Sequence, residues 1–195
     1  PIVATDSGTA NTRGSESMRI ISNTTIYSDG RHNAFTSMVA WRDRYWVAFR
    51  NGARHSSHDG RVMMTSSSDL EHWSTPIIAL DTPVDERDPK LVVLQDRLLL
   101  AAFSSHRVYA NEAQLGGLVN TLSLHTTMTC TADGEHWQQP WIATEPYHFI
   151  WWMRQRNGLL FASERKSRKV IVDGKQQTEC YSAFLRSHDG RQWER

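Results

Sequence analysis

The chain has 195 residues, a formal net charge of +1 at pH 7 and 39% hydrophobic residues, a composition that fits one globular domain. A net charge this close to zero, without a run of Lys or Arg, argues against a nucleic-acid-binding protein. No apolar run approaches the roughly 18 residues of a membrane-spanning helix, so we expect no membrane partner either.

The expected elements, taken in chain order, begin with a polar leader. Residues 1–17 are rich in Ser, Thr, Gly and Asn and show no periodicity, which predicts a flexible segment. A strand is expected within residues 18–27, before a turn at Ser28-Asp29-Gly30. Short apolar strands then follow in three groups. These are 35–41, 45–50, 61–66 and 76–80, then 88–94, 97–103, 121–130 and 141–144, then 149–153, 159–163 and 180–186, with polar loops at 51–60, 104–120 and 164–177.

One motif, Ser/Thr-x-Asp-(Gly/Leu)-x-x-Trp, recurs at a spacing of about 60 residues, which is the mark of a repeat architecture. An Asp side chain accepts hydrogen bonds from backbone N–H groups two residues on, Gly tolerates a positive φ, and Trp supplies a large apolar plate, so the motif predicts a tight turn between strands. Its structural pairs are Asp69 with Trp73, Asp133 with Trp137 and Asp189 with Trp193. Three residues before each motif stands a large apolar residue that should be buried on the same strand face of every repeat: Met64, Met128 and Phe184.

Four short strands per unit of about 55–65 residues, with no helical stretch, predict the blades of an all-β propeller. The blades span about residues 34–80, 88–144 and 149–195, within a partial propeller over residues 18–195. Propellers typically close with about four to eight blades, so three cannot complete a ring. We therefore expect the chain to be the N-terminal half of a six-bladed propeller, with the remaining blades C-terminal to residue 195.

The two cysteines, Cys130 and Cys180, stand at different positions of the repeat. Their registers differ by about six residues, which is roughly 20 Å along a strand, whereas the Cα atoms of a disulfide lie within about 7 Å. Both are therefore expected to be thiols. They do not decide the cellular compartment, for which a secreted or periplasmic location is favoured.

Blade topology sorts the connections onto two ends of the molecule. The motif turns and the turns between first and second strands lie at one end, whereas the loops between second and third strands and the links between blades lie at the other. The second end, which we call the rim, is dense in Arg, His, Asp and Glu. Because functional residues concentrate on loops carried by rigid scaffolds, we expect the site there.

These patterns resemble a known family. The motif resembles the Asp-box, or BNR, repeat of sialidases, although it is one residue shorter than the usual Ser-x-Asp-x-Gly-x-x-Trp. The order of segments over residues 18–193 resembles bacterial sialidase-like propellers, often labelled exo-alpha-sialidase; the segments that carry this resemblance are His32-Asn33-Ala34-Phe35-Thr36, Ala48-Phe49-Arg50, His55, Asp59-Gly60 and Glu86-Arg87-Asp88-Pro89-Lys90-Leu91. The resemblance implies a glycoside hydrolase that acts on a terminal acidic sugar, with three arginines on the sugar carboxylate, an Asp acid/base and a Tyr–Glu nucleophile.

The resemblance carries over to this chain only in part. Arg50 stands where an early family arginine would, Arg87 is a second arginine candidate, and Asp59 lies in the loop that would supply the acid/base, with Asp88 as a second catalytic candidate. The Tyr and the last arginine are expected beyond Arg195. The remaining substrate-binding candidates at the rim are Asn33, His55, Glu86 and His148. The expected partner is a glycan or small sugar, and no metal or cofactor is expected, since His55 has no second His at ligand spacing.

Other interpretations stay open. Asp59 could serve only as a turn former, because Ser57–Arg61 repeats the start of the third motif without its Trp, and Arg87 could pair locally with Asp88 or Glu86. A carbohydrate-binding or scaffolding propeller without catalysis would use the same rim, and Asp88 paired with another carboxylate would favour a glycosidase or lyase for neutral or uronic sugars. If the rim is an anion site, Arg50, Asp59 and Arg87 should face a common space beside His55, with no carboxylate matching the two arginines.

Overall fold

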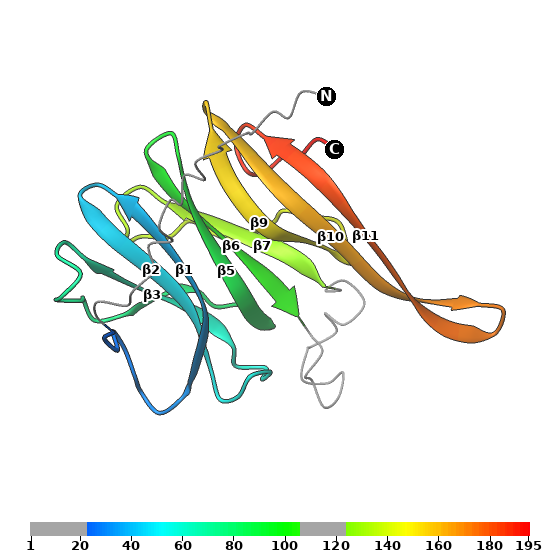
Figure 1. Ribbon diagram of the computed structural model, residues 1–195, viewed down its shortest axis with the longest axis horizontal. Coiled ribbons are helices and arrows are strands. Elements are labelled where there is room, and N and C mark those ends of the chain that lie inside the picture. The colour runs from blue at the N-terminus through cyan, green and yellow to red at the C-terminus, as the bar shows by residue number, and fades with distance from the viewer. Residues whose placement is uncertain (1–22, 106–123) are drawn as a thin grey trace, which may run out of the picture.

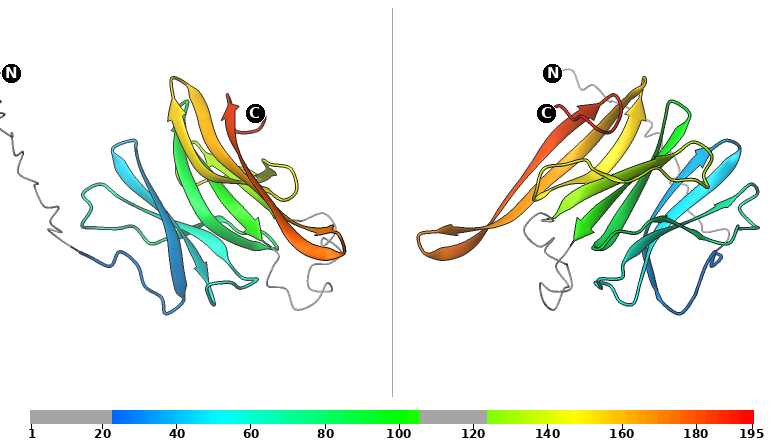
Figure 2. Two further views of the ribbon diagram at one scale, coloured as in Figure 1. Left: turned by 45° about the vertical axis from the view of Figure 1, so that its right-hand side comes forward. Right: turned by 180° about the vertical axis from the view of Figure 1, so that it is seen from behind.

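A computed structural model of the chain describes residues 23–105 and 124–195, apart from the side chains of residues 167–169. The described residues form antiparallel strands and no helix, arranged as three sheets side by side (Figures 1 and 2). The first sheet has the order β1(His32–Trp41), β2(Arg44–Gly52), β3(Arg61–Ser67), β4(Ile77–Leu80). The second has the order β5(Asp85–Leu94), β6(Arg97–Ser105), β7(His125–Thr131), β8(Trp141–Ile142), and the third the order β11(Lys175–Ser187), β10(Leu159–Val172), β9(His148–Arg156).

Each sheet is a blade of a β-propeller, and its strands follow the chain order. The first two strands of every blade form a hairpin whose two turn residues have positive φ: Arg42 and Asp43, Gln95 and Asp96, Asn157 and Gly158. Positive φ at both positions is the type I′ turn, whose twist matches the strands on either side. This local chemistry sets the register of β1 on β2, of β5 on β6 and of β9 on β10.

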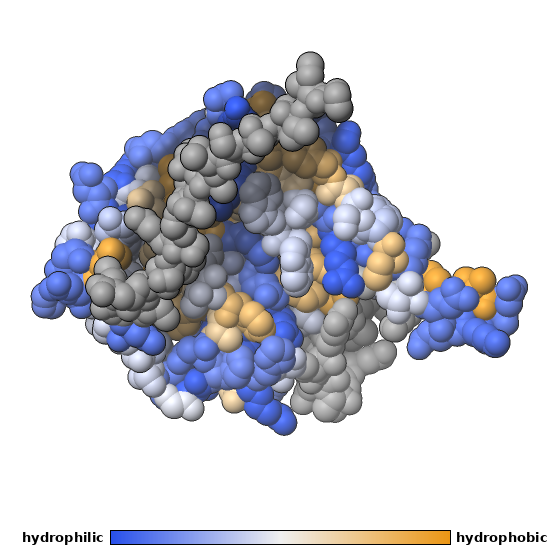
Figure 3. Space-filling model, viewed as in Figure 1, coloured by the Kyte–Doolittle hydropathy of each residue, from blue (hydrophilic) through white to orange (hydrophobic). Residues whose placement is uncertain are grey.

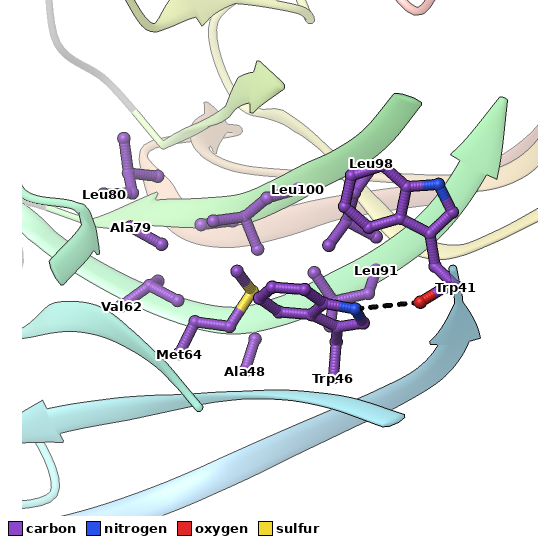
Figure 4. Packing of buried hydrophobic residues seen from close by; sticks show 11 residues of the cluster. Trp41, Trp46, Ala48, Val62, Met64, Ala79, Leu80, Leu91, Leu98 and Leu100 are labelled. Carbon is purple, nitrogen blue, oxygen red and sulfur yellow. Dashed lines mark hydrogen bonds between the residues drawn. The ribbon is translucent and has the colours of Figure 1, made fainter. Parts of the chain in front are cut away.

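The hydrophobic core lies between the blades rather than within one of them. Figure 4 shows the cluster between the first two blades, where Trp46 and Trp41 pack on Leu98 and Leu100, and the Trp46 indole N–H donates to the Trp41 carbonyl at 3.1 Å. A second cluster, including Met128, fills the space between the second and third blades. Since β1 packs beside β5 and β5 beside β9, the first strands of the three blades lie next to one another on the inner side.

The three motif turns have the predicted geometry. Asp69 Oδ1 accepts the backbone N–H groups of Glu71 and His72 at 2.9 and 2.8 Å, and Asp133 and Asp189 each accept the equivalent pair. The first two turns join β3 to β4 and β7 to β8, and the third follows β11. The motif tryptophans pack, partly buried, against three separate apolar clusters: Trp73, Trp137 and Trp193.

Burial of the residue three before each motif was predicted for all three repeats and is wrong for the third. Met64 and Met128 are 1% and 0% exposed, because each faces the next blade. Phe184 occupies the same face of the third blade and is 63% exposed, since no described sheet covers it. Its ring stacks instead on Phe161, at 5.6 Å between centroids.

Two expected elements also differ. The loop expected over 164–177 is a β-hairpin, because β10 runs on to Val172 and β11 begins at Lys175. Its turn is Asp173-Gly174, both with positive φ, and the hairpin projects from the body with Ile171 exposed near its tip (Figures 1 and 3). Residues 23–27 form no strand; residues 18–22, the leader 1–17 and the start of the strand expected at 121 lie outside the described residues. Neither cysteine forms a disulfide, as predicted.

Candidate functional site

Arg50, at the rim end of β2, is completely buried. Its Nε donates to Asp85 Oδ1 at 2.7 Å, its Nη1 to the Arg54 carbonyl at 2.8 Å and its Nη2 to Ser57 Oγ at 3.0 Å. A Cβ on Gly60 would stand 2.7 Å from Arg50 Nη2 and would overlap Asp85, so only glycine fits beside this pair. Arg50 therefore ties the loop after β2 to the first residue of β5, with its charge met by Asp85.

Arg87 lies on the other side of Asp85 and reaches the surface. Its Nη1 is 3.8 Å from Asp85 Oδ2 and 2.7 Å from Ser56 Oγ, and its Nη2 is 3.1 Å from His55 Nε2. The guanidinium also lies over the Phe35 ring, at 5.1 Å from the centroid. The side chain of Arg87 is 14% exposed, so it is the accessible member of a cluster in which two guanidinium groups share one carboxylate.

This geometry brings Arg50, Arg87 and His55 together, as expected. The expectation that no carboxylate would match the two arginines is wrong, because Asp85 lies between them. Asp85 directly precedes the rim residues identified from sequence, but nothing local marks it as the partner of an arginine in another blade. The Arg50–Asp85 pair joins the first blade to the second.

Asp59 lies in the same loop but points to a different partner. Its carboxylate accepts a hydrogen bond from Arg31 Nη2 and another from the Ala53 backbone N–H at 3.1 Å. Burial alone would raise the pKa of Asp59, but hydrogen bonds from Ser57, Ala53 and Arg31 outweigh it and hold the pKa well below its usual range. A general acid needs a raised pKa, so these contacts suit a turn-stabilising residue better than a proton donor.

Asp88 stands in a β-bulge at the rim end of β5. The register of β5 on β6 shifts between Arg87 and Lys90, and Asp88 has φ 47°. The first blade has the same irregularity, with Phe35 at φ 58° in the bulge of β1. Positive φ in residues other than Gly costs of the order of 1–3 kcal/mol and is concentrated at functional sites, and bulges are over-represented beside active sites.

The remaining rim candidates occupy equivalent ends of the three inner strands. Asn33 bonds Asp29 and Asn51, so it braces the turn before β1. Glu86 is fully buried and accepts hydrogen bonds from Thr82 and from Ser104 Oγ, the latter at 2.8 Å. Burial is the main cause that raises the pKa of Glu86 to about 7, with smaller contributions from the neighbouring acids Asp85 and Asp81.

His148 belongs to a separate cluster in the third blade. Its Nδ1 lies 3.2 Å from Glu164 Oε1 and 3.1 Å from Arg195 Nη2, and its ring meets the edge of Tyr181. Glu164, which the sequence places at the start of a rim loop, was not among the substrate-binding candidates; it is buried on β10. Among the described residues, no group of three or more His, Cys, Asp or Glu side chains is placed to hold a metal ion, and no helix could cross a membrane.

Comparison with known proteins identifies the fold. No family model and no curated protein matches the sequence. The structure is similar to Zg3597, a family 117 glycoside hydrolase from Zobellia galactanivorans, with 9% identity and a TM-score of 0.53 over 80% of this chain and 52% of that one. It is also similar to Trypanosoma rangeli sialidase in complex with sialic acid, with 12% identity and a TM-score of 0.53 over 84% of this chain and 30% of that one.

A third similar structure is an N-acetylgalactosamine deacetylase from F. plautii in complex with blood group B trisaccharide, with 14% identity and a TM-score of 0.55 over 84% of this chain and 51% of that one. The chain therefore spans about half the length of these proteins, or less. The shared feature is the all-β propeller fold of carbohydrate-active enzymes, and at these identities the similarity concerns the fold alone.

Proposed function

We propose that this chain carries part of the sugar site of a sialidase-like glycoside hydrolase that acts on a terminal acidic sugar. The observation that carries the proposal is the rim cluster of Arg50, Asp85 and Arg87, whose one accessible member is the Arg87 guanidinium, bordered by His55 and Phe35. The similar folds of a sialidase and of a family 117 glycoside hydrolase support the class of protein.

In this proposal Arg87 binds the carboxylate of the sugar. A guanidinium presents two parallel N–H donors that match a carboxylate, and partial burial strengthens such a pair relative to one in water. Asp85 holds Arg87 in place and is itself held by Arg50. His55 and Phe35 border the guanidinium and would limit the ways in which a sugar can approach.

Asp88 is the carboxylate that we assign to the reaction, as acid/base at the sugar. It lies one residue from Arg87, in the bulge of β5, and its side chain is partly exposed. The initial acid/base candidate, Asp59, has its carboxylate engaged by Arg31 and a low pKa, which oppose proton donation. The nucleophile and a further arginine are expected from blades beyond Arg195.

A second candidate function, carbohydrate binding without catalysis, is favoured by the engagement of Asp59. If Asp88 also takes no part in proton transfer, the rim retains the cationic binding cluster and has no acid/base. In both proposed functions Arg87 binds the sugar carboxylate. The two functions differ only in whether the bound sugar is then hydrolysed.

The proposal is tested by calorimetric titration of the 195-residue chain with N-acetylneuraminic acid, and with N-acetylmannosamine as the neutral comparison. We expect saturable binding of the acid only, weakened about tenfold or more by Arg87→Gln, since a hydrogen bond to a charged group contributes about 1.5–3 kcal/mol. Arg156→Gln, at an exposed arginine at the end of β9, is the matched control and should leave binding unchanged. Equal binding of both sugars, or an unchanged affinity in Arg87→Gln, would refute the carboxylate site.

Turnover separates the two candidates. Hydrolysis of an aryl α-glycoside of N-acetylneuraminic acid that is lost in Asp88→Asn and retained in Asp59→Asn supports the hydrolase. Because the nucleophile is expected from further blades, this assay uses a protein that also carries them, and binding without hydrolysis there supports the non-catalytic binder.

A further inference from the structure

A cavity lies on the inner side of the blades, where β1, β5 and β9 run side by side. It has a volume of about 360 Å³, within the range of small-molecule sites. Its lining includes the polar, charged and large apolar residues Ser37, Met38, Lys90, Trp152, Arg154 and Gln155. All three blades therefore contribute to one pocket, which we call the inner-strand pocket.

The charged residues that line the inner-strand pocket are both cations, Lys90 and Arg154. Lys90 Nζ donates to the backbone carbonyl of Asp88 and lies 5.4 Å from the centroid of the Trp151 ring. The Arg154 guanidinium lies over Trp152, at 5.7 Å from its centroid. Across the described part of the chain, no carboxylate lies within ion-pair distance of either cation.

Burial without a counter-ion is unfavourable for Lys90. Its pKa is lowered to about 8, mainly by burial, and the charge of Asp88 only partly offsets this effect. Packing offers no reason to place two cations on one pocket, because like charges repel and a partly buried charge needs a partner. A bound anion would supply the missing counter-charge for the buried Lys90.

The inner-strand pocket is distinct from the rim cluster. Arg87 contacts Phe35 and His55 of the first blade and has Asp85 beside it. Lys90, three residues later and beyond the bulge, instead contacts Trp151 of the third blade. The two cations of β5 therefore serve different spaces, and Arg87 does not line the pocket.

We propose that the inner-strand pocket binds a small oxyanion-bearing molecule, such as a carboxylate on a compact ring, with Lys90 and Arg154 as its charge partners. The Ser37 and Gln155 side chains line the same space and can hydrogen-bond to the neutral part of the ligand. Trp152 provides an apolar wall that is 45% exposed, as suits a ring placed against it. This site does not depend on the proposed function at the rim.

The test is titration of the 195-residue chain with glucuronate, with inorganic sulfate and with glucose, followed by calorimetry and by tryptophan fluorescence, to which Trp152 in the pocket contributes. We expect glucuronate to bind and glucose not to bind; binding of sulfate at the same site would show that the oxyanion, rather than the ring, is recognised. Lys90→Met and Arg154→Gln should each weaken glucuronate about tenfold or more. Lys175→Met and Arg156→Gln, at exposed cations outside the pocket, are the matched controls and should leave the affinity unchanged.

Arg87→Gln distinguishes this site from the rim. Glucuronate affinity that falls in Lys90→Met and in Arg154→Gln supports the inner-strand pocket, whereas affinity that falls in Arg87→Gln and in neither of these variants would overturn it. Equal binding of glucose would also overturn it. Arg154 is exposed, so its replacement should not affect folding. Arg154→Gln therefore still tests the site if Lys90→Met does not fold.

Discussion

Gly134, in the motif turn of the second blade, lies directly against the indole ring of Trp46 in the first blade. A Cβ built on Gly134 would overlap this ring, with Trp46 Cζ2 only 2.7 Å away. Gly190 lies in the same way against the second blade, where a Cβ would be 3.1 Å from Leu99 Cδ2. The motif glycine of each later blade is therefore a contact with the blade before it. The equivalent residue in the first blade is Leu70, which is 47% exposed.

Gly134→Ala should destabilise the protein more than Gly158→Ala does. Both glycines have positive φ, 88° and 78°, but Gly158 has open space around it. Strain alone should cost about 1 kcal/mol at Gly158, and the overlap with Trp46 should add about 1–3 kcal/mol at Gly134. Urea denaturation of both variants measures the difference; equal losses would mean that the turn, rather than the contact between blades, requires the glycine.

Removal of the Arg50 side chain should be strongly destabilising. Arg50→Met leaves Asp85 buried without its nearest cation, and breaking a buried pair costs about 3–5 kcal/mol. Arg42→Met is the matched comparison, because the Arg42–Asp96 pair is exposed and should contribute no more than about 1 kcal/mol. Denaturation of both variants measures these losses. A loss at Arg50 as small as that at Arg42 would show that Asp85 is stabilised by its other contacts.

The stability of the protein should depend on the ionisation of Glu86. Its pKa is raised from 4.5 to about 7 in the folded state, so between these values the folded state binds more protons than the unfolded state. The free energy of unfolding should therefore fall as the pH rises through this range, with this contribution complete below pH 4.5 and lost above pH 7. The expected loss is roughly 3 kcal/mol.

Glu86→Gln provides the control for this pH dependence. The amide does not titrate, so the difference in unfolding free energy between the two proteins should change between pH 4.5 and 7 and remain constant above that range. Urea denaturation at a series of pH values measures it. A difference that is independent of pH would show that Glu86 titrates normally in the folded state.

Trp137→Ala should destabilise the protein without affecting the rim. Trp137 packs against the cluster between the first two blades but is only partly buried, so we expect a loss of about 3 kcal/mol, at the lower end for a large aromatic residue. Binding of acidic sugar at Arg87 should persist in the folded fraction. Unchanged thermal unfolding together with lost sugar binding would reverse the assignment of the two ends of the blades.

Local chemistry explains what could be predicted from sequence. The motif turns are formed by contacts within a few residues, such as Asp133 to the N–H groups of Glu135 and His136, so the residue types alone predict them. Short apolar runs between turn residues predicted the strands. The repetition of these runs and turns about every 60 residues predicted the blades. The projecting hairpin was missed because residues 164–177 are largely polar, although its Asp173-Gly174 turn was a usable signal.

Tertiary structure decided which charges meet. Asp85 pairs with Arg50 of another blade, Asp59 pairs with Arg31, and Lys90, which has no ion-pair partner among the described residues, lines a pocket shared by three strands. These relationships join segments that are far apart in the sequence, so no local pattern predicts them. The sequence determined the blades and their turns, because backbone hydrogen bonding acts within each repeat, whereas the pairing of Arg50 with Asp85 depended on how one blade packs against the next.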